Sequence, residues 1–376
     1  MLIAGEASGD ILAAELVKAL RADSPSSLEF YGAGGPKMTE AGVELAVDMT
    51  AHSVIGLVEA LKSYPRFKKL FYQLLQLAIQ RKPDVIICVD FSGFNRRFAH
   101  AVKEYIRNNQ SSVGDWKPKI VQFVSPQVWA SRPSRAEKMA RDIDLLLCIF
   151  PFEKDWYAKR TPNLRVEFIG HPIVDRHGVQ SLKSKIQSEK PLVLLLPGSR
   201  VAELKRHLPT MLEAAKQISA NQSVQFKMVL PDEKLKQLAN GMSVLRPNLE
   251  IQIGGLAESL SQTALAIAST GTVTMECAYF GVPTIAIYKT SWSTYQIAKR
   301  IIQVKFLAMP NLLANEMVFP EFIQNEATPE NISQKAIELL NNSGRRDEIK
   351  VKLAKIIQSL GGPGASERAA KAILNL

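Results

Sequence analysis

Two short segments of this chain have residue types that can bind an anion, and each accompanies an apolar run typical of a buried strand. Gly5-Glu6-Ala7-Ser8-Gly9-Asp10 follows Met1–Ala4, and Leu196-Pro197-Gly198-Ser199-Arg200 ends Leu192–Leu196. Gly198 lets the backbone approach a ligand, Ser199 can donate a hydrogen bond, and the planar fork of Arg200 suits phosphate oxygens. The first segment is explained equally well as a tight turn that needs small residues.

A third segment, Ser269-Thr270-Gly271-Thr272, follows the apolar run Ala264–Ala268 and opens a predicted helix that continues through Val273 and Glu276. Amides and hydroxyls at a helix N-terminus can hold a diphosphate without a metal. Glu276 lies one turn further and could accept hydrogen bonds from ribose hydroxyls. Two such loops in one half of the chain predict a nucleotide or anion site.

Asp90 directly follows the nearly continuous apolar run Asp84–Val89. A carboxylate at the carboxyl end of a buried parallel strand lies where ligands bind. There it could act as a general base towards a hydroxyl nucleophile if burial or a neighbour raises its pKa. The alternative is an Asp that caps the following helix.

The remaining candidates are weaker. His171, in Gly170-His171-Pro172, could take part in the chemistry, but a lone His is more often structural. The five His residues are scattered without metal-binding spacing, so we expect no catalytic metal. The cysteines lie apart in apolar runs, which predicts reduced, buried thiols: Cys88, Cys148 and Cys277.

Strand-like runs alternate with helical stretches, and the pattern restarts near residue 192. This alternation predicts an α/β protein with two Rossmann-like, doubly wound domains facing across a cleft. We place the first domain at 1–174 and the second at 175–350, with Asp175–Lys190 as the linker. Helices in 351–376 could cross back onto the first domain.

Lys and Arg number 47 against 36 Asp and Glu, giving a net charge of +11 in 376 residues. This excess favours polyanionic partners such as nucleic acid, anionic lipid or a phosphorylated substrate.

No apolar run approaches the ~18 residues of a spanning helix, and Met1 leads straight into a strand, so we expect a soluble cytosolic protein without a signal peptide. Ser53–Gln80 combines large apolar residues with Lys and Arg. It suits an interfacial helix or an ordinary core-facing helix, with nucleic-acid binding as a third option.

Six segments together resemble the lipid-A-disaccharide synthase family, in order over most of the chain. They are Gly5–Asp10, Ser125-Pro126-Gln127-Val128-Trp129-Ala130, Phe150-Pro151-Phe152-Glu153, Gly170-His171-Pro172, Leu196–Arg200 and Pro310-Asn311-Leu312-Leu313-Ala314. The resemblance implies GT-B architecture and an inverting glycosyltransferase at the inner membrane of Gram-negative bacteria. The implied reaction joins UDP-2,3-diacylglucosamine to 2,3-diacylglucosamine 1-phosphate (lipid X), forms a β(1→6) disaccharide and releases UDP.

Site roles follow from the same resemblance, which assigns Asp90 as the general base. The nucleotide side would comprise Gly198, Ser199, Arg200, Ser269, Thr270, Gly271, Thr272, Val273 and Glu276. The acceptor or cleft side would comprise Gly5, Ser8, Gly9, Asp10, Asn95, Gln127, His171 and Asn311. The membrane-facing residues would be Val54, Ile55, Leu57, Phe67, Leu70 and Phe71.

The chain departs from the family pattern at two places: Gly93 replaces a second Asp, and Asn315-Glu316 replaces a Gly-Arg pair. The resemblance implies no metal or other cofactor, no nucleic acid, and a peripheral position on the cytoplasmic membrane face. Two other hypotheses remain open. One is a different UDP-sugar enzyme of the same architecture, such as another glycosyltransferase or a UDP-GlcNAc 2-epimerase. The other is a non-catalytic protein that binds anionic membrane or nucleic acid.

Overall fold

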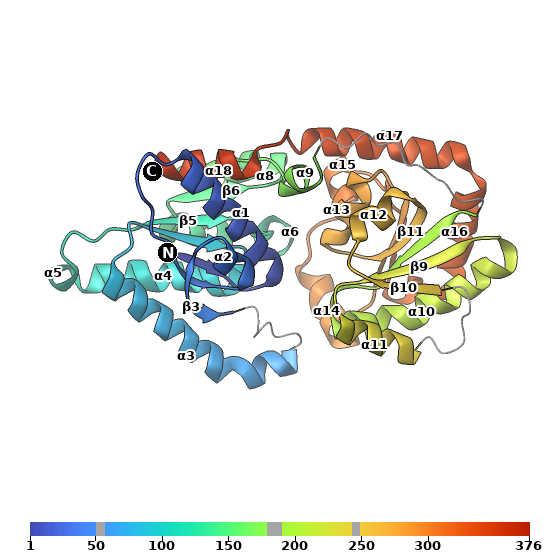
Figure 1. The fold of residues 1–376 in the computed structure, drawn as a ribbon, viewed down its shortest axis with the longest axis horizontal. Coiled ribbons are helices and arrows are strands. Elements are labelled where there is room, and N and C mark those ends of the chain that lie inside the picture. The colour runs from blue at the N-terminus through green and yellow to red at the C-terminus, as the bar shows by residue number, and fades with distance from the viewer. Residues whose placement is uncertain (50–56, 179–189, 243–248) are drawn as a thin grey trace. The chain divides into compact units, whose positions relative to one another are not determined.

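The computed structural model describes residues 1–49, 57–178, 190–242 and 249–376, with helix position but not side chains for 57–64 and 66. The chain forms two compact units, drawn in Figure 1. Unit 1 contains Met1–Asp175 and Leu360–Leu376, and unit 2 contains Arg176–Ser359. The predicted linker, 175–190, falls mostly outside the described residues. The predicted C-terminal segment, 351–376, divides between the two units at Leu360.

Unit 1 is built on a parallel sheet in which seven described strands follow the order β3-β2-β1-β4-β5-β6-β7. The strands are β1 (Leu2–Ala4), β2 (Tyr31–Gly34), β3 (Glu44–Asp48), β4 (Val85–Val89), β5 (Lys119–Phe123), β6 (Leu145–Cys148) and β7 (Arg165–Phe168). The helices are α1 (Ala7–Asp23), α2 (Pro36–Glu40), α3 (Leu57–Arg81), α4 (Ser92–Asn108), α5 (Gln110–Val113), α6 (Val128–Ser131), α7 (Arg135–Asp142), α8 (Pro151–Ala158), α9 (Pro172–His177) and α18 (Ala365–Leu374).

Unit 2 repeats this plan with six described strands in the order β10-β9-β8-β11-β12-β13. The strands are β8 (Leu192–Leu196), β9 (Gln225–Leu230), β10 (Leu249–Ile253), β11 (Thr263–Ser269), β12 (Thr284–Tyr288) and β13 (Glu321–Ile323). The helices are α10 (Val201–Asn221), α11 (Glu233–Met242), α12 (Leu256–Ser261), α13 (Thr272–Tyr279), α14 (Trp292–Ile301), α15 (Met309–Ala314), α16 (Pro329–Asn341) and α17 (Ser343–Ser359).

The strand order determines which of the candidate ligand-binding loops lie next to one another. In unit 1 the chain order reverses between the neighbours β1 and β4, and in unit 2 between β8 and β11. Ligands of doubly wound sheets bind at such switch points, outside the carboxyl ends of the strands. Gly5 and Asp90 therefore follow neighbouring strands, as do Pro197 and Thr270.

The last helix of the chain, α18, packs on α1 within unit 1. Ala369, Ala370 and Ile373 share a buried cluster with Leu16 and Leu20 of α1. The start of α18 is held by the Asp175 carboxylate, which accepts hydrogen bonds from the amides of residues 364 and 365 at 2.6 and 2.9 Å. The chain terminus thus completes one face of the unit 1 core.

The predicted α/β class with two doubly wound domains is confirmed. The apolar runs Met1–Ala4, Asp84–Val89, Leu192–Leu196 and Ala264–Ala268 correspond to β1, β4, β8 and β11, whereas β3, β7 and β13 were missed. The missed strands lie at sheet edges and are only half-buried or exposed. Edge strands lack the continuous apolar run that identifies a strand covered on both faces.

Candidate active site

Asp90 stands at the end of β4 in a conformation that non-glycine residues rarely adopt. Its φ is 47°, and the next residue, Phe91, has a φ of 43°. Each left-handed residue costs roughly 1–3 kcal/mol. The amide of Asp90 donates to the Phe123 carbonyl of neighbouring β5 at 2.8 Å. The chain therefore leaves the sheet at Asp90 in one fixed direction.

Two buried amide side chains hold this turn. Nδ2 of Asn95 lies 2.9 Å from the Asp90 carbonyl oxygen and 3.2 Å from that of Val89. Nε2 of Gln122 lies 3.3 Å from the Asp90 carbonyl and 3.1 Å from that of Val124. Asn95 is wholly buried, so its predicted place on the acceptor surface is wrong. It acts through Asp90, as does Gln122, which the sequence analysis missed.

The electrostatics of the turn favour a base. Burial raises the pKa of Asp90, the carboxylate of Glu6 raises it further, and a hydrogen bond from the Phe91 backbone opposes both effects. A carboxylate with a raised pKa binds a proton more readily near neutral pH. Glu6, also absent from the predicted site, lies in the loop that follows the adjacent strand β1.

The predicted glycines of the first loop have a steric purpose. A Cβ on Gly5 would overlap the ring of Phe91. Phe91 in turn stacks on Phe94 with ring centroids 5.5 Å apart. A Cβ on Gly9 would lie 3.6 Å from the Val89 carbonyl oxygen, which is ordinary contact. Gly5 therefore allows the turn at Asp90 to close against the first loop, whereas Ser8 is exposed and available to a ligand.

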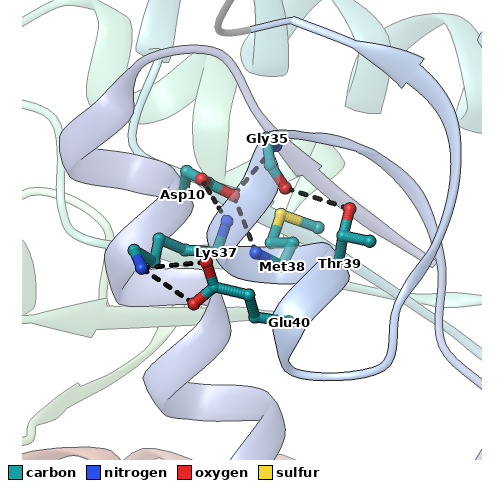
Figure 2. Close-up of polar contacts among 6 residues, drawn as sticks. All are labelled: Asp10, Gly35, Lys37, Met38, Thr39 and Glu40. Carbon is teal, nitrogen blue, oxygen red and sulfur yellow. Dashed lines mark hydrogen bonds and ion pairs between the residues drawn. The ribbon is translucent and has the colours of Figure 1, made fainter.

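Asp10 is not a ligand-facing residue, which corrects its predicted role. Figure 2 shows its carboxylate at the start of α2, where it accepts hydrogen bonds from the amides of Gly35, Lys37 and Met38 at 2.8–3.0 Å. Only 2% of Asp10 is exposed. An acidic group at a helix N-terminus satisfies amides that the helix itself cannot pair. Asp10 thus ties α1 to the loop after β2.

Two further motifs of unit 1 are joined by a buried carboxyl group. Glu153 accepts from the Trp129 indole at 3.0 Å and from the Phe150 amide at 3.1 Å. Burial raises the pKa of Glu153 to about 7 despite these hydrogen bonds. Gln127, in the loop before Trp129, is exposed, as a ligand-binding residue requires. His171 accepts from the Ile173 amide through Nδ1 at 3.1 Å.

In unit 2 the loop Pro197–Arg200 is shaped by a residue of the following helix. Gly198 has a φ of 119°, and a Cβ there would overlap the side chain of Glu203. Glu203 accepts from the Ser199 amide at 3.1 Å. Nη1 of Arg200 lies 3.9 Å from the same carboxylate, and 44% of the Arg200 side chain is exposed. The guanidinium can therefore reach an incoming anion.

A buried imidazole that the sequence analysis missed supports this loop. Nδ1 of His207 donates to the Pro197 carbonyl at 2.8 Å, while Nε2 accepts from the Lys289 amide at 3.0 Å. These two hydrogen bonds fix one neutral tautomer. Burial lowers the pKa of His207 accordingly. The loop after β8 and the end of β12 are thereby held together.

The second predicted loop of unit 2 contributes less than expected. Ser269 is buried, and the Thr270 amide donates to the Ile287 carbonyl within the sheet at 3.1 Å, so that amide is not available to a ligand. Gly271, with a φ of 133°, turns the chain into α13. Thr272 is exposed and Val273 half-buried. The first-turn amides of a helix have no carbonyl partner within it, so they can donate hydrogen bonds to a bound anion.

Glu276 of α13 is already engaged. Its carboxylate lies 2.8 Å from Nε2 of His177, and both side chains are largely buried. The His177 ring also packs against Tyr279 and Phe280, with centroids 5.2 and 5.0 Å away. A ribose hydroxyl would have to share Glu276 with this imidazole. His177 was missed because it falls in the predicted linker, Asp175–Lys190, where no local pattern marks it as a partner of Glu276.

Asn311 is the third predicted acceptor residue, after Asn95 and Asp10, that does not face a ligand. It is wholly buried in unit 2. Its Nδ2 donates to the Phe319 carbonyl and to Glu321, and its Oδ1 accepts from the Phe319 amide, all at 2.7 Å. Every polar atom of the side chain is occupied. Asn311 therefore organises the chain between α15 and β13 and does not face an acceptor.

Three residues of the predicted membrane-facing set are partly covered by the core of unit 1. Phe67, Leu70 and Phe71 of α3 are half-buried and pack against the core beneath the helix. The exposed face presents instead Lys68, Lys69 and Tyr72, the last 54% exposed. Three other predicted members cannot be placed: Val54 and Ile55 lie outside the described residues, and the side chain of Leu57 is not described.

Within the described part of the chain, no three His, Cys, Asp or Glu side chains come together as a metal site. No helix in the same residues is long and apolar enough to cross a membrane.

The sequence profile of the lipid-A-disaccharide synthetase family matches residues 1–375. Relatives named lipid-A-disaccharide synthase include that of Trichlorobacter lovleyi, 35% identical over all of this chain and 97% of the relative. The protein of Geobacter metallireducens is 36% identical over 100% and 96%, and that of Coxiella burnetii 33% identical over 100% and 98%.

Solved structures share the fold at low identity. A putative UDP-N-acetylglucosamine 2-epimerase from Listeria monocytogenes has a TM-score of 0.63 and 14% identity, covering 100% of this chain and 94% of its own. The kitacinnamycin glycosyltransferase also scores 0.63 at 17% identity, covering 100% and 98%. Acinetobacter baumannii MurG scores 0.58 at 16% over the same shares. These similarities establish a GT-B-type, two-domain α/β fold.

The structural role of Asp10 gives a stability prediction. Asp10→Ala should lower the free energy of unfolding by about 2–4 kcal/mol, because three buried amides lose an ionised acceptor. Chemical denaturation followed by circular dichroism would measure the change. Glu40→Gln is the matched control, because it removes only the exposed Lys37–Glu40 ion pair, worth ~0.5 kcal/mol. Equal stability of the two variants would contradict the capping role.

Proposed function

The chain belongs to the lipid-A-disaccharide synthase family, and we propose that it catalyses that family's glycosyl transfer. The donor is UDP-2,3-diacylglucosamine and the acceptor is 2,3-diacylglucosamine 1-phosphate. The products are a β(1→6)-linked disaccharide 1-phosphate and UDP. The observation that carries the mechanism is the fixed turn at Asp90, which presents a carboxylate of raised pKa at the switch point of the first sheet.

The proposed reaction is a single displacement with inversion. Asp90 takes the proton of the acceptor 6-hydroxyl while that oxygen attacks the anomeric carbon of the donor sugar. The bond from the anomeric carbon to the diphosphate oxygen breaks, and its electron pair leaves with UDP. Asn95 and Gln122 hold the Asp90 carbonyl and so fix the backbone that carries the carboxylate. Such preorganisation avoids ordering the base during the reaction.

Unit 2 supplies charge compensation for the leaving group in this proposal. Arg200 offers a half-exposed guanidinium beside the loop of Gly198 and Ser199. The first turn of α13, at Thr272 and Val273, offers backbone amides and the positive end of the helix dipole. These groups can stabilise the negative charge that grows on the diphosphate. We therefore propose that the reaction needs no bound metal.

A UDP-GlcNAc 2-epimerase is the second function considered. Its support is the likeness to solved epimerases, which at 12–14% identity extends to the fold alone. An epimerase would act on an unacylated UDP-sugar without an acceptor. The full-length family match favours the transferase.

We also propose a peripheral position on the cytoplasmic face of the inner membrane. Both sugars carry acyl chains, so the enzyme must work at a lipid surface. The exposed side of α3 presents Lys68, Lys69 and Tyr72. Basic residues near an anionic surface contribute about 1 kcal/mol each, and Tyr suits the interface between water and lipid.

Asp90→Asn is the decisive substitution for the catalytic proposal. Asn tolerates the left-handed backbone of this position, so the variant removes the base without straining the turn. We expect kcat to fall by about 10²- to 10⁴-fold while UDP affinity stays unchanged. UDP release in detergent–lipid micelles, with and without lipid X, would measure this.

Glutamine at the neighbouring Glu6 is the matched control and should retain most activity at neutral pH. If Asp90→Asn lost both UDP affinity and turnover, Asp90 would have a structural role and would not be the base. UDP release by the native enzyme without lipid X would indicate hydrolysis or another acceptor. No release by the folded enzyme would refute the proposed function and direct attention to the other UDP-sugar enzymes.

The pKa of Asp90 predicts a pH dependence. Because burial and Glu6 raise that pKa, activity should be lost on acidification through a value above the ordinary one for Asp, near 4. Glu6→Gln removes one of the two causes, so the acidic limb of the kcat/KM profile should move to lower pH. If the acidic limb of the kcat/KM profile stayed at the same pH in Glu6→Gln, the effect of Glu6 on the pKa of Asp90 would be contradicted.

The membrane proposal is tested on exposed side chains only. Replacing Lys68 and Lys69 with Gln and Tyr72 with Ser should weaken binding to anionic vesicles by about tenfold or more, since each cation contributes ~1 kcal/mol. Sedimentation with vesicles of phosphatidylglycerol would measure it. Substituting Phe67 or Phe71 would disturb the core as well. Undiminished sedimentation of the triple variant would refute this surface.

A further inference from the structure

Four arginines that the proposed mechanism does not use gather at the start of two neighbouring helices of unit 1. Arg96 and Arg97 lie in the second turn of α4, Arg132 precedes α7, and Arg135 begins it. Arg96 and Arg135 are half-buried, while Arg97 and Arg132 are exposed. We call these residues the arginine cluster.

Two polar contacts join α4 to the end of α7 and to the residues that follow it. Nδ1 of His100 on α4 lies 3.1 Å from the Asp142 carboxylate at the end of α7. Lys103, one turn later, lies 2.8 Å from the Asp144 carboxylate. Arg96 precedes His100 by one helical turn, and Arg135 precedes Asp142 by two. Both arginines therefore lie on the faces through which α4 and α7 pack.

No carboxylate of the described residues compensates the charge of the arginine cluster. Among the residues that the structure describes, none of its four guanidinium groups has an acid within 4.0 Å, and Glu137 in the first turn of α7 forms no ion pair with them. Burial lowers the pKa of Arg135, and the charges of Arg132, Arg96 and Arg97 lower it further. The positive end of each helix dipole adds to the repulsion. Folding alone gives no reason to collect four cations here.

The place of the cluster indicates which anion it suits. Helix α4 begins two residues after Asp90, and α6 and α7 follow β5, the strand next to β4. The cluster therefore lies on the segments that leave the carboxyl edge of the sheet beside the proposed base. Planar guanidinium forks bind the oxygens of a phosphate monoester in pairs. The donor offers only a diphosphate diester, which the loops of unit 2 can hold.

We propose that the arginine cluster binds the phosphate monoester of the sugar acceptor and so orients its free hydroxyl towards Asp90. This inference rests on the proposed function, which makes a sugar 1-phosphate the acceptor. Arg135 and Arg96 form the half-buried floor of the site, and Arg97 and Arg132 reach the phosphate from the exposed side.

The test compares two acceptors that differ only in the phosphate. Arg132→Gln, Arg135→Gln and the double variant would be assayed with 2,3-diacylglucosamine 1-phosphate and with the same sugar lacking the phosphate. The KM for the phosphorylated acceptor should rise by about 10- to 100-fold, as the loss of charged hydrogen bonds predicts. The KM for the other acceptor and the Kd for UDP should not change. Arg107→Gln, exposed at the far end of α4, is the matched control.

Equal losses on both acceptors would overturn the proposal and mark the cluster as structural. Lost vesicle binding with an unchanged acceptor KM would overturn it in favour of a lipid headgroup site. Thermal unfolding separates these results from misfolding, because removing uncompensated charge should leave the melting temperature unchanged or raise it.

If the native enzyme forms no disaccharide, the proposed function fails, and direct binding still decides the inference. Calorimetric titration of the phosphorylated sugar into the double variant should then show weaker binding than to the native chain. Equal binding would refute the site.

Discussion

The left-handed turn at Asp90 and Phe91 is the constraint on which the arrangement of unit 1 depends. Neither residue favours this conformation, so the surroundings must hold it. Asn95 does so through its amide nitrogen, whose two hydrogens are shared among three carbonyl oxygens at 2.9–3.3 Å, those of Ile3, Val89 and Asp90. Its Oδ1 finds no partner among the described residues. An unpaired buried acceptor costs about 1–3 kcal/mol, so the side chain is retained for its donors. Gly5 completes the arrangement, because only a residue without a Cβ leaves room for the Phe91 ring.

Unit 2 solves the same problem with different chemistry. His207 stands behind the loop after β8 and binds Pro197 through one nitrogen and Lys289 through the other. Because burial lowers its pKa, the imidazole stays neutral and can both donate and accept. In each unit a wholly buried polar side chain fixes the loop, while the side chain offered to a ligand, Asp90 or Arg200, remains partly exposed. The residues that hold each loop in place are therefore different from the residues that a ligand can reach.

The sequence predicted the frame of this site well and the direction of its side chains poorly. Apolar runs identified the covered strands, and with them the loops that follow β4, β8 and β11. Motif membership did not distinguish side chains that face a ligand from those that hold the motif together. Asp10, Asn95 and Asn311 all read as polar site residues, yet each is buried and hydrogen-bonds to backbone amides or carbonyls. His207 and Gln122 were missed because each also binds a backbone atom far along the chain, at Lys289 and Asp90, which no local pattern encodes.

The distribution of charge leads to a further conclusion. A net charge of +11 predicted an anionic partner without saying where it binds. Many ion pairs of the described chain join exposed residues three apart on a helix, such as Lys335–Glu338, and these contribute little to stability. The informative positions are the ones where cations lack such partners. At the start of α4 and α7 the repulsion among Arg96, Arg132 and Arg135 opposes folding, and a helix N-terminus increases it. A bound anion would remove this repulsion, and the free energy released would contribute to its binding. A group of cations without acidic partners therefore indicates a binding site that no sequence motif marks.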